Sequence, residues 1–421
     1  MSSNPSSASR LSQLAALIRE SVTKLEETLS AQGFQSPSLD EDAPQSLPRD
    51  TVDMRDVIID CAAELQALLL GPLEIIYRNG AHNNCVSLQA ISRLKIASLV
   101  PIGGQTTFAK IAEQTGLDER AVRRLLRHAM TLRVFREPEP GVVAHTKVSK
   151  VLTNPVANDW CRAGTEEMWP AATKMVDAFQ KWPGSPEPNH TGFSLANNTE
   201  DSIYQVLEKN PERASRFANT MIAYTMMTEY DTSHIFNNYD WKSLGQVQMI
   251  DVGGGAGHHS MELARRFPNL SVIVQDMNEM FEGIKVPEEL EGRFEFMAYD
   301  LFAPQTVQAD VYFFRWIFHN WSDKYSIMII KALIPALKPG AKIILNESCM
   351  PEPGEIAHWR EQDLRSFDIS MGASFNSYER SLDEWKALLS EADPRFVFQR
   401  VSGAKDSALS IIEFVWSDGK H

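Results

Sequence analysis

A glycine-rich segment, VGGGAGHH over residues 252–259, offers backbone rather than side chains to whatever lies beside it. It follows an apolar run that ends in Asp251 and precedes a helical pattern. Two later apolar runs also end in an acid, VIVQD at Asp276 and FEFMAYD at Asp300. Glycine lets a ligand approach the main chain closely, and carboxylates accept hydrogen bonds from hydroxyl and amino groups. The pattern predicts a ligand-binding site that is lined by acidic side chains.

Several interpretations compete for this segment. A P-loop is disfavoured because no Gly-Lys-Ser/Thr follows the glycines. The loop alone does not exclude a dinucleotide, and a tight strand-to-helix turn without a ligand also stays open. However, Asp251 would repel a pyrophosphate, and Asp276 lies where such folds hold a ribose diol. Acids without a basic cradle favour a nucleoside that carries an amino group and a positive charge, a description that S-adenosylmethionine (SAM) fits.

The elements that would position these residues follow from the hydrophobic pattern. From Val247 onward, apolar runs of strand length alternate with helical patterns as far as AKIILNES at residues 341–348. This alternation predicts a mostly parallel, doubly wound sheet with helices on both faces. In such a sheet, ligands bind beyond the carboxyl ends of the strands, where the strand order reverses.

His319, in the segment FFRWIFHNWSD, follows one of these strands. A lone histidine is most often structural, but its position at the ligand-bearing end of a parallel strand makes it a candidate base. Imidazole titrates near neutral pH and can accept a hydroxyl proton, a role typically worth about 10²- to 10⁴-fold in rate.

The segment Thr106–Thr146 has the pattern of a winged helix. A first helix stops at Gly116, Asp118 is the candidate N-cap of a second helix, and RVFRE and VVAHT predict two strands around a Pro-Gly turn. The second helix carries four arginines that could contact DNA: Arg120, Arg123, Arg124 and Arg127. The formal net charge of −14 instead favours a packing module whose arginines are solvated, and it argues against nucleic acid as a partner.

The length of 421 residues predicts more than one domain. We expect an N-terminal helix and flexible linker at 1–50, a helical and winged-helix domain at 51–200, and a ligand-binding catalytic domain at 201–421. No apolar run approaches the roughly 20 residues of a membrane span, and the first residues lack a signal-peptide pattern. The four cysteines are scattered without a CxxC pair, so we expect a reducing, cytoplasmic location and no metal site.

Residues 100–421 resemble the class I, SAM-dependent small-molecule O-methyltransferases of the plant caffeate type and their fungal secondary-metabolite relatives. The motifs that carry the resemblance occur in the expected order: DVGGGAG, QD, YDLF, RWIFHNWSD, NESCMPE and SYERS. The resemblance implies a Rossmann-like α/β methyltransferase domain, SAM as cofactor, and an N-terminal α-helical winged-helix domain that forms a homodimer.

The resemblance also implies roles for residues of this chain. Near the cofactor it places Asp251, Gly253, Gly255, Gly257, Asp276, Asp300 and Arg315, with Asp276 at the ribose and Asp300 at the adenine. In the catalytic group it places His319 as the base, flanked by Glu347 and Glu379. Against an aromatic substrate it places Phe217, Met221 and Met371, although an aromatic and methionine stripe at helical spacing is as readily core.

Two departures and two alternatives remain. Asn320 stands where the family commonly has an acid, and the segment from Asp368 to Glu379 is one residue shorter than in plant relatives. We expect methyl transfer to a phenolic or enolic hydroxyl of a small polyketide-like molecule. The alternatives are a pericyclase or dehydratase that uses SAM as a fixed positive charge, and a DNA-binding regulator with a decayed enzyme domain.

Overall fold

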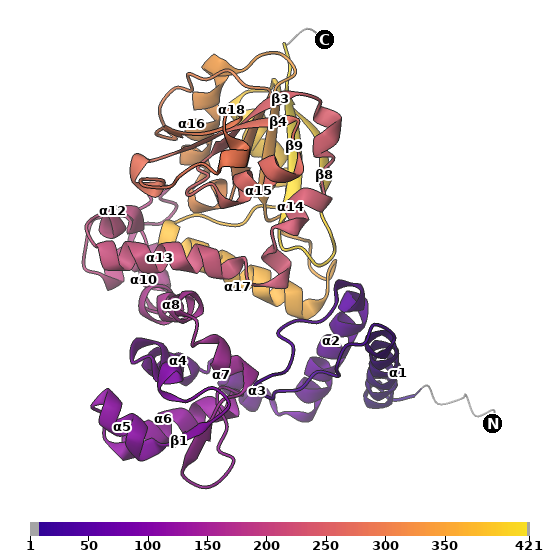
Figure 1. The fold of residues 1–421 in the computed structure, drawn as a ribbon, viewed down its shortest axis with the longest axis vertical. Helices are drawn as coiled ribbons and strands as arrows, with labels where there is room; N and C mark the ends of the chain where they lie inside the picture. The colour runs from indigo at the N-terminus through magenta and orange to yellow at the C-terminus, as the bar shows by residue number, and fades with distance from the viewer. Residues whose placement is uncertain (1–7, 419–421) are drawn as a thin grey trace, which may run out of the picture. The chain divides into compact units, whose positions relative to one another are not determined.

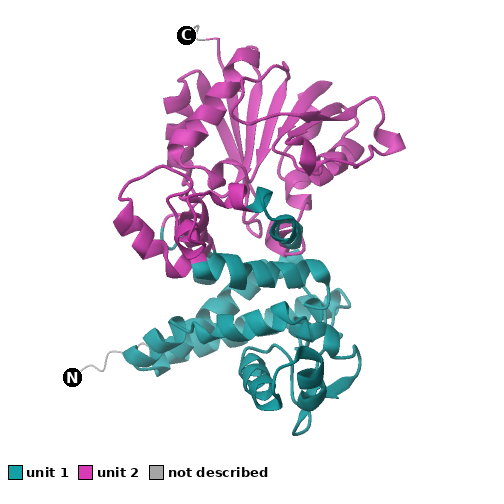
Figure 2. Ribbon diagram, turned by 90° about the vertical axis from the view of Figure 1, so that its left-hand side faces the viewer, with its two compact units in different colours: residues 1–170, 207–223, 353–363 teal, residues 171–206, 224–352, 364–421 magenta. Residues whose placement is uncertain are grey.

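The computed structural model describes residues 8–418 and divides them into two compact units, each assembled from three stretches of chain (Figure 2). Unit 1 comprises residues 8–170, 207–223 and 353–363. Unit 2 comprises residues 171–206, 224–352 and 364–418. These units interleave along the chain and do not follow one another. The domain boundaries expected after residues 50 and 200 stay a prediction.

Unit 1 is mainly helical. Its elements up to residue 163 are α1 (Arg10–Ala31), α2 (Val52–Leu69), α3 (Pro72–Asn79), α4 (Asn83–Arg93), β1 (Gln105–Thr107), α5 (Phe108–Thr115), α6 (Glu119–Thr131), β2 (Val142–Ala144), α7 (Lys147–Val151) and α8 (Pro155–Ala163) (Figure 1). Helix α1 begins at the N-cap Ser9, whose side chain accepts a hydrogen bond from the Ser12 backbone N–H.

The winged helix is present, with one correction. Asp118 caps α6 by accepting a hydrogen bond of 3.0 Å from the Ala121 backbone N–H, and β1 pairs with β2 in antiparallel register. The strand expected at residues 133–137 is wrong: only a single bridge joins Arg136 to Ala144. Arg133 and Phe135 have φ values of 67° and 65°, which interrupt an extended conformation.

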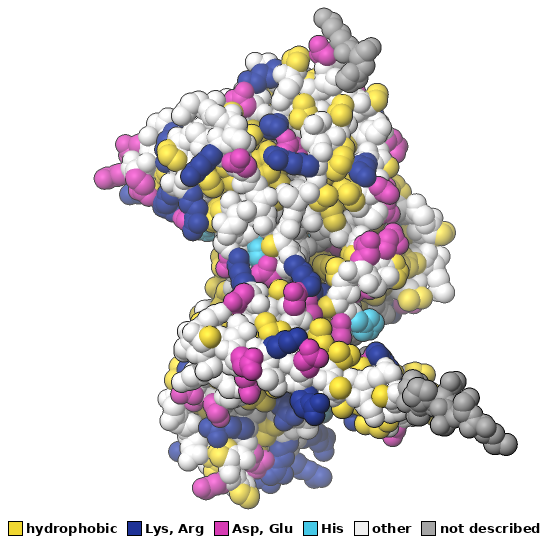
Figure 3. Space-filling model, turned by 90° about the vertical axis from the view of Figure 1, so that its right-hand side faces the viewer, with side chains coloured by type: hydrophobic (Ala, Val, Ile, Leu, Met, Phe, Trp, Pro, Cys, Tyr) yellow, Lys and Arg dark blue, Asp and Glu magenta, His cyan; other side chains and the backbone are white. Residues whose placement is uncertain are grey.

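Two of the four arginines on α6 carry acidic partners. Arg123 pairs with Glu119, and Arg127 pairs with Glu137 at 2.8 Å. Figure 3 shows acidic and basic side chains interspersed over the visible face. These ion pairs fit the interpretation of α6 as a packing element whose arginines are solvated.

Unit 2 contains a sheet of seven strands. They are β3 (Val247–Val252), β4 (Leu270–Asp276), β5 (Phe294–Ala298), β6 (Val311–Arg315), β7 (Lys342–Glu347), β8 (Phe396–Ser402) and β9 (Ser410–Trp416). The later helices of the chain are α9 (Trp169–Thr173), α10 (Met175–Lys181), α11 (Gly192–Ala196), α12 (Ile203–Glu208), α13 (Pro211–Tyr224), α14 (Ser233–Asn237), α15 (His258–Arg266), α16 (Asp323–Leu333), α17 (His358–Phe375) and α18 (Leu382–Ala392).

The strand order is β5-β4-β3-β6-β7-β9-β8. Strands β3 to β7 are parallel, and β9 pairs with β7 and β8 in antiparallel register. The order reverses at β3, which lies between β4 and β6. The predicted doubly wound, mostly parallel sheet is confirmed, and its switch point lies at the strand that precedes the glycine-rich segment.

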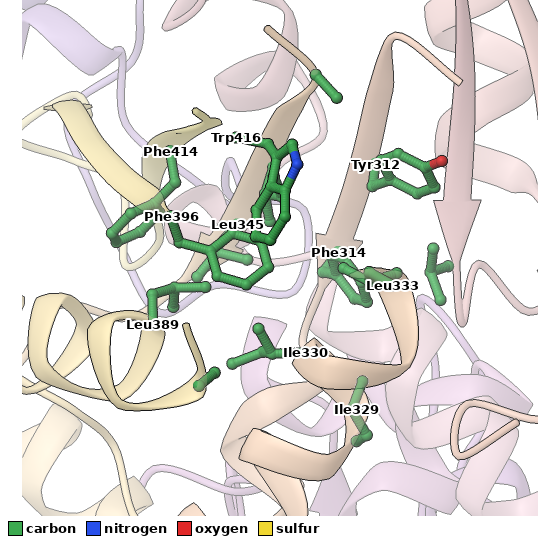
Figure 4. Close-up of a cluster of buried hydrophobic side chains, with 14 of the residues drawn as sticks. Tyr312, Phe314, Ile329, Ile330, Leu333, Leu345, Leu389, Phe396, Phe414 and Trp416 are labelled. Atoms are coloured by element: carbon green, nitrogen blue, oxygen red, sulfur yellow. The ribbon is translucent and has the colours of Figure 1, made fainter. Parts of the chain in front are cut away.

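Two apolar cores cover the sheet. One joins the strands to α16 and α18, and Figure 4 shows Tyr312, Phe314 and Leu345 of the strands beside Ile330 and Leu389 of those helices. The other joins the sheet to α14 and α15. Among the described residues, no helix is long and apolar enough to cross a membrane. Packing on both faces fixes the strands whose carboxyl ends carry the candidate site.

Candidate functional site

The glycine-rich segment turns sharply between β3 and α15. Gly253, Gly255 and Gly257 have φ values of 77°, 55° and 73°, which favour glycine. A Cβ on Gly253 would come within 2.3 Å of the Ile317 side chain, and one on Gly254 within 2.3 Å of the Asp251 carboxylate. Side chains at Gly253 and Gly254 would therefore crowd Ile317 and the Asp251 carboxylate, while a Cβ on Gly255 would meet only Met280 at 3.9 Å.

Asp251 lies behind this segment. It is buried, and its carboxylate accepts a 2.6 Å hydrogen bond from the Ser260 hydroxyl on α15. Burial raises the pKa of Asp251 to about 6, although Ser260 and the positive charge of Arg315 oppose the rise. The carboxylate thus ties β3 to α15, while its contact with a ligand stays a prediction.

Asp276 ends β4 beside the glycines. Its two carboxylate oxygens accept hydrogen bonds from the backbone N–H groups of Gly255 at 2.8 Å and Met277 at 2.7 Å. Burial raises its pKa even though both hydrogen bonds favour the charged form. A carboxylate has about four lone-pair sites, so each oxygen can still accept from a ribose hydroxyl. Asp300, by contrast, is exposed and accepts from the Phe302 backbone N–H at 3.0 Å.

The turn after β6 is held by a carboxylate from the neighbouring strand. Glu347, fully buried at the end of β7, accepts hydrogen bonds from the backbone N–H groups of Ile317 at 2.8 Å and Phe318 at 2.9 Å. Burial raises its pKa to about 7. The predicted catalytic residue Glu347 therefore contacts the backbone that leads to His319.

His319 lies in the 3-10 helix Phe318–Asn320 and is 4% exposed. Its Nδ1 is 2.8 Å from Oε1 of the buried Glu379. Burial alone would lower the pKa of His319, but the charge and hydrogen bond of Glu379 outweigh it and raise the pKa. Glu379 is positioned in turn by its backbone N–H, which donates to Asp368 at 2.7 Å. The Glu379 carboxylate orients the imidazole of His319 through its hydrogen bond with Nδ1.

Two buried carboxylate oxygens beside His319 keep acceptor capacity. Oε2 of Glu347 and Oε2 of Glu379 have no hydrogen-bond partner among the described residues. Buried polar atoms in folded proteins are nearly always paired. These oxygens are therefore suited to accept hydrogen bonds from a bound molecule or from water.

Arg380 anchors the turn that carries His319, and it was missed by the sequence analysis. It is fully buried and donates to the carbonyls of Phe318 at 3.0 Å and Trp321 at 2.8 Å, and to Asp323 at 2.7 Å. It follows Glu379 directly in the chain, so one segment supplies both the carboxylate that orients His319 and the cation that anchors its turn. Its place in SYERS was the only available signal.

Aromatic rings surround the imidazole within unit 2, and these too were missed. The Trp316 ring is parallel to the His319 ring, with 5.9 Å between centroids and 5° between planes. Phe367 of α17 lies 5.9 Å from His319, and Tyr224 and Tyr230 lie 5.2 Å and 5.1 Å from Trp316. Trp316 lies three residues before His319 in RWIFHNWSD, whereas Phe367, Tyr224 and Tyr230 come from distant parts of the chain that no local motif links to His319.

Arg315 ends β6 and interacts electrostatically with Asp251 of the predicted cofactor group and with Glu347 of the predicted catalytic group. It donates to the Asn346 side chain and, at 3.4 Å, to the Tyr230 carbonyl. Burial lowers its pKa to about 10 against the opposing charges of Glu347 and Asp251. Arg315 remains charged near neutral pH and counters the two carboxylates.

The remaining predicted residues fall in different units. Phe217 and Met221 lie one helical turn apart on α13 in unit 1. Met371 lies on the part of α17 that belongs to unit 2 and is buried. Their predicted contact with a substrate stays a prediction.

Among residues 8–418, no group of three or more His, Cys, Asp or Glu side chains could hold a metal ion.

Comparisons with known proteins give a consistent result. Residues 188–394 match the model of an O-methyltransferase domain, and residues 80–155 match that of an O-methyltransferase dimerisation domain. The O-methyltransferase PaMT of Phomopsis amygdali is 39% identical over 97% of both chains. A chlorophenol O-methyltransferase of Trichoderma longibrachiatum is 36% identical over 98% of this chain and 91% of its own.

A solved structure described as LepI in complex with SAM has the same fold. It is 20% identical with a TM-score of 0.76, and the match covers 97% of this chain and all of that one. At this identity the likeness concerns the fold alone.

We expect Asp276→Ala to weaken SAM binding by about 2–4 kcal/mol, because a partly buried diol loses a charged acceptor and the Gly255 N–H loses its partner. Isothermal titration calorimetry measures the loss. Asp300→Ala, at an exposed carboxylate, should cost less than about 1 kcal/mol. Equal affinities for the wild type and Asp276→Ala would contradict the assignment.

Proposed function

The chain belongs to the O-methyltransferase family, and on that premise we propose that it methylates a phenolic or enolic hydroxyl of a small polyketide-like molecule, with His319 as the general base. The protein is a SAM-dependent O-methyltransferase. The buried hydrogen bond of 2.8 Å between His319 and Glu379 carries the proposal for the base. The chlorophenol acceptor in the name of one relative supports a phenolic hydroxyl here.

The residues at the switch point fit SAM. Asp276 offers lone pairs to the ribose hydroxyls, and Gly255 leaves space beside it. The nearby acids Asp251 and Asp300 suit a cofactor that carries an amino group and a positive sulfur, and no phosphate-binding lysine follows the glycines. When bound, SAM supplies an electrophilic methyl group on its sulfonium and leaves as S-adenosylhomocysteine.

His319 accepts the proton of the acceptor hydroxyl. Glu379 receives the Nδ1–H, which leaves Nε2 as the basic nitrogen. The negative charge of Glu379 stabilises the imidazolium that forms, and burial of the pair keeps water from competing for the proton. His319 would thus present a deprotonated oxygen to the methyl group that SAM, held by Asp276, would supply.

Glu347 acts as a positioning residue. It fixes the two backbone N–H groups that precede His319, so the imidazole is presented from a rigid turn rather than a loose loop. Alignment of oxygen, methyl carbon and sulfur depends on such rigidity, since small displacements of reacting groups cost large factors in rate.

We also propose that the dimerisation domain forms a homodimer. Unit 1 exposes a run of large apolar side chains on and between α2 and α3, which supports a partner surface: Leu68, Leu69, Leu73, Ile76 and Tyr77. The domain match at residues 80–155 begins just after this run.

The first test separates methyl transfer from catalysis by a retained cofactor. With excess acceptor and limiting SAM, the product should be about 14 Da heavier than the acceptor, in an amount capped by the SAM supplied. His319→Gln should lower turnover by about 10²- to 10⁴-fold while SAM affinity stays nearly unchanged. Mass spectrometry quantifies product and S-adenosylhomocysteine together.

The opposite outcome identifies the alternative. Many turnovers per SAM, with a product of unchanged mass or one lighter by water, would mean that only the positive charge of SAM is used. That result would reject methyl transfer and favour a pericyclase or dehydratase.

The second test uses pH. The raised pKa of His319 means that kcat/KM is low below that pKa and rises with pH as the imidazole becomes neutral. Glu379→Gln keeps an oxygen that can accept from Nδ1–H but removes the charge that raises this pKa, so burial, which lowers the pKa, has more weight. The rising limb should therefore move to lower pH, while the plateau falls by about 10²- to 10⁴-fold. A limb that stays in place while the plateau falls would mean that Glu379 does not act through His319.

The third test concerns assembly. Light scattering at micromolar concentration should give about twice the chain mass of 47.3 kDa. Leu73→Asp, at a side chain that is 80% exposed, should shift the protein toward monomer. A stable wild-type monomer would contradict the homodimer.

A further inference from the structure

Trp316 has an uncommon backbone conformation. Its φ of 55° lies in the left-handed region, which a bulky aromatic residue rarely adopts. The surrounding structure holds it there: its N–H donates to the Asn346 carbonyl at 3.3 Å, and the next two N–H groups donate to Glu347. Strain of this kind, held by several partners, is concentrated at functional sites.

Asn320 completes this arrangement. Its side-chain Nδ2 donates to the Trp316 carbonyl at 3.0 Å. An ionised aspartate at this position could only accept hydrogen bonds and would repel that carbonyl. The departure from the acid that the family commonly has here thus has a physical consequence: the amide locks the backbone of Trp316.

The indole N–H of Trp316 has no partner. Nε1 is a buried donor without a hydrogen-bond acceptor among the described residues. Buried tryptophan N–H groups usually find a partner, as those of Trp241 and Trp385 do with the carbonyls of Ile235 and Ser348. An unpaired donor in a buried site costs stability unless a ligand accepts from it.

This donor lies beside the candidate base. The Trp316 ring is parallel to the His319 imidazole and within 6.3 Å of Phe367. The indole therefore lies beside the imidazole at which the acceptor hydroxyl would bind. Rings that flank this position suit a flat molecule.

We propose that the Trp316 indole N–H donates a hydrogen bond to a second oxygen of the acceptor, close to the reacting hydroxyl. The inference rests on the proposed methyl transfer and narrows the substrate class to planar aromatic or enolic compounds with a neighbouring carbonyl, hydroxyl or alkoxy oxygen. Trp316 then selects and orients the acceptor, because a site built to pair with an oxygen rejects an analogue that lacks it.

The test compares matched phenols in the wild type and Trp316→Phe, which removes the N–H but keeps an aromatic ring. One pair is 2-hydroxyacetophenone and 2-ethylphenol, which differ in the carbonyl oxygen. The wild type should prefer the oxygen-bearing acceptor by about 5- to 100-fold in kcat/KM, and Trp316→Phe should reduce this preference to within about threefold. Trp316→Phe should lose more kcat/KM on 2-hydroxyacetophenone than on 2-ethylphenol.

Trp241→Phe is the matched control. It removes an indole N–H that is fully buried and already paired in unit 2, so it should lower thermal stability and leave the acceptor preference intact. A thermal unfolding curve for Trp316→Phe shows whether the variant folds, and calorimetry gives its SAM affinity, which should be unchanged.

Three results would overturn the inference. An unchanged preference in Trp316→Phe would mean that the N–H does not meet the acceptor. Weakened SAM binding with an unchanged preference would place the donor on an oxygen of the cofactor. An unfolded Trp316→Phe protein, with Trp241→Phe folded, would make the indole structural. Failure of the wild type to methylate any phenol tests the proposed function separately.

Discussion

The candidate site depends on one buried carboxylate that joins two neighbouring parallel strands. Glu347 at the end of β7 binds the backbone N–H groups just beyond β6, where the two strands pair in register at Arg315 and Asn346. Without an acceptor, those N–H groups would be buried and unpaired, a cost of about 1–3 kcal/mol each. The carboxylate therefore determines the path of the chain from Trp316 to His319.

The charged side chains around His319 are balanced by one another rather than by contact with water. Glu347 and Glu379 lie beside His319, while Arg315 and Arg380 supply the positive charge of this region. Burial raises the pKa of Glu347, whereas the charge and hydrogen bond of Glu379 raise the pKa of His319 against the effect of burial. A proton gained by the imidazole is thus stabilised by the structure before any ligand arrives.

The sequence predicted well what depends on neighbours along the chain and poorly what depends on contacts across the fold. The alternation of strands and helices and the N-cap at Asp118 were readable because period and capping are local. The expected strand at 133–137 failed because two left-handed residues interrupt it. The contact of Phe367 with His319 and the anchoring role of Arg380 could not be read from the sequence because their partners lie far away along the chain.

The interleaving of the two units has a consequence for synthesis. In unit 1, Arg360 pairs with Asp56 at 2.9 Å, and the Asp60 carboxylate accepts from the N–H groups of His358 and Trp359, all across about 300 residues. These contacts cannot form until the ribosome has made most of the chain, so the first unit to begin folding is among the last to be completed. During that interval the carboxylates of Asp56 and Asp60 lack these partners, so unit 1 stays incomplete while the rest of the chain is made.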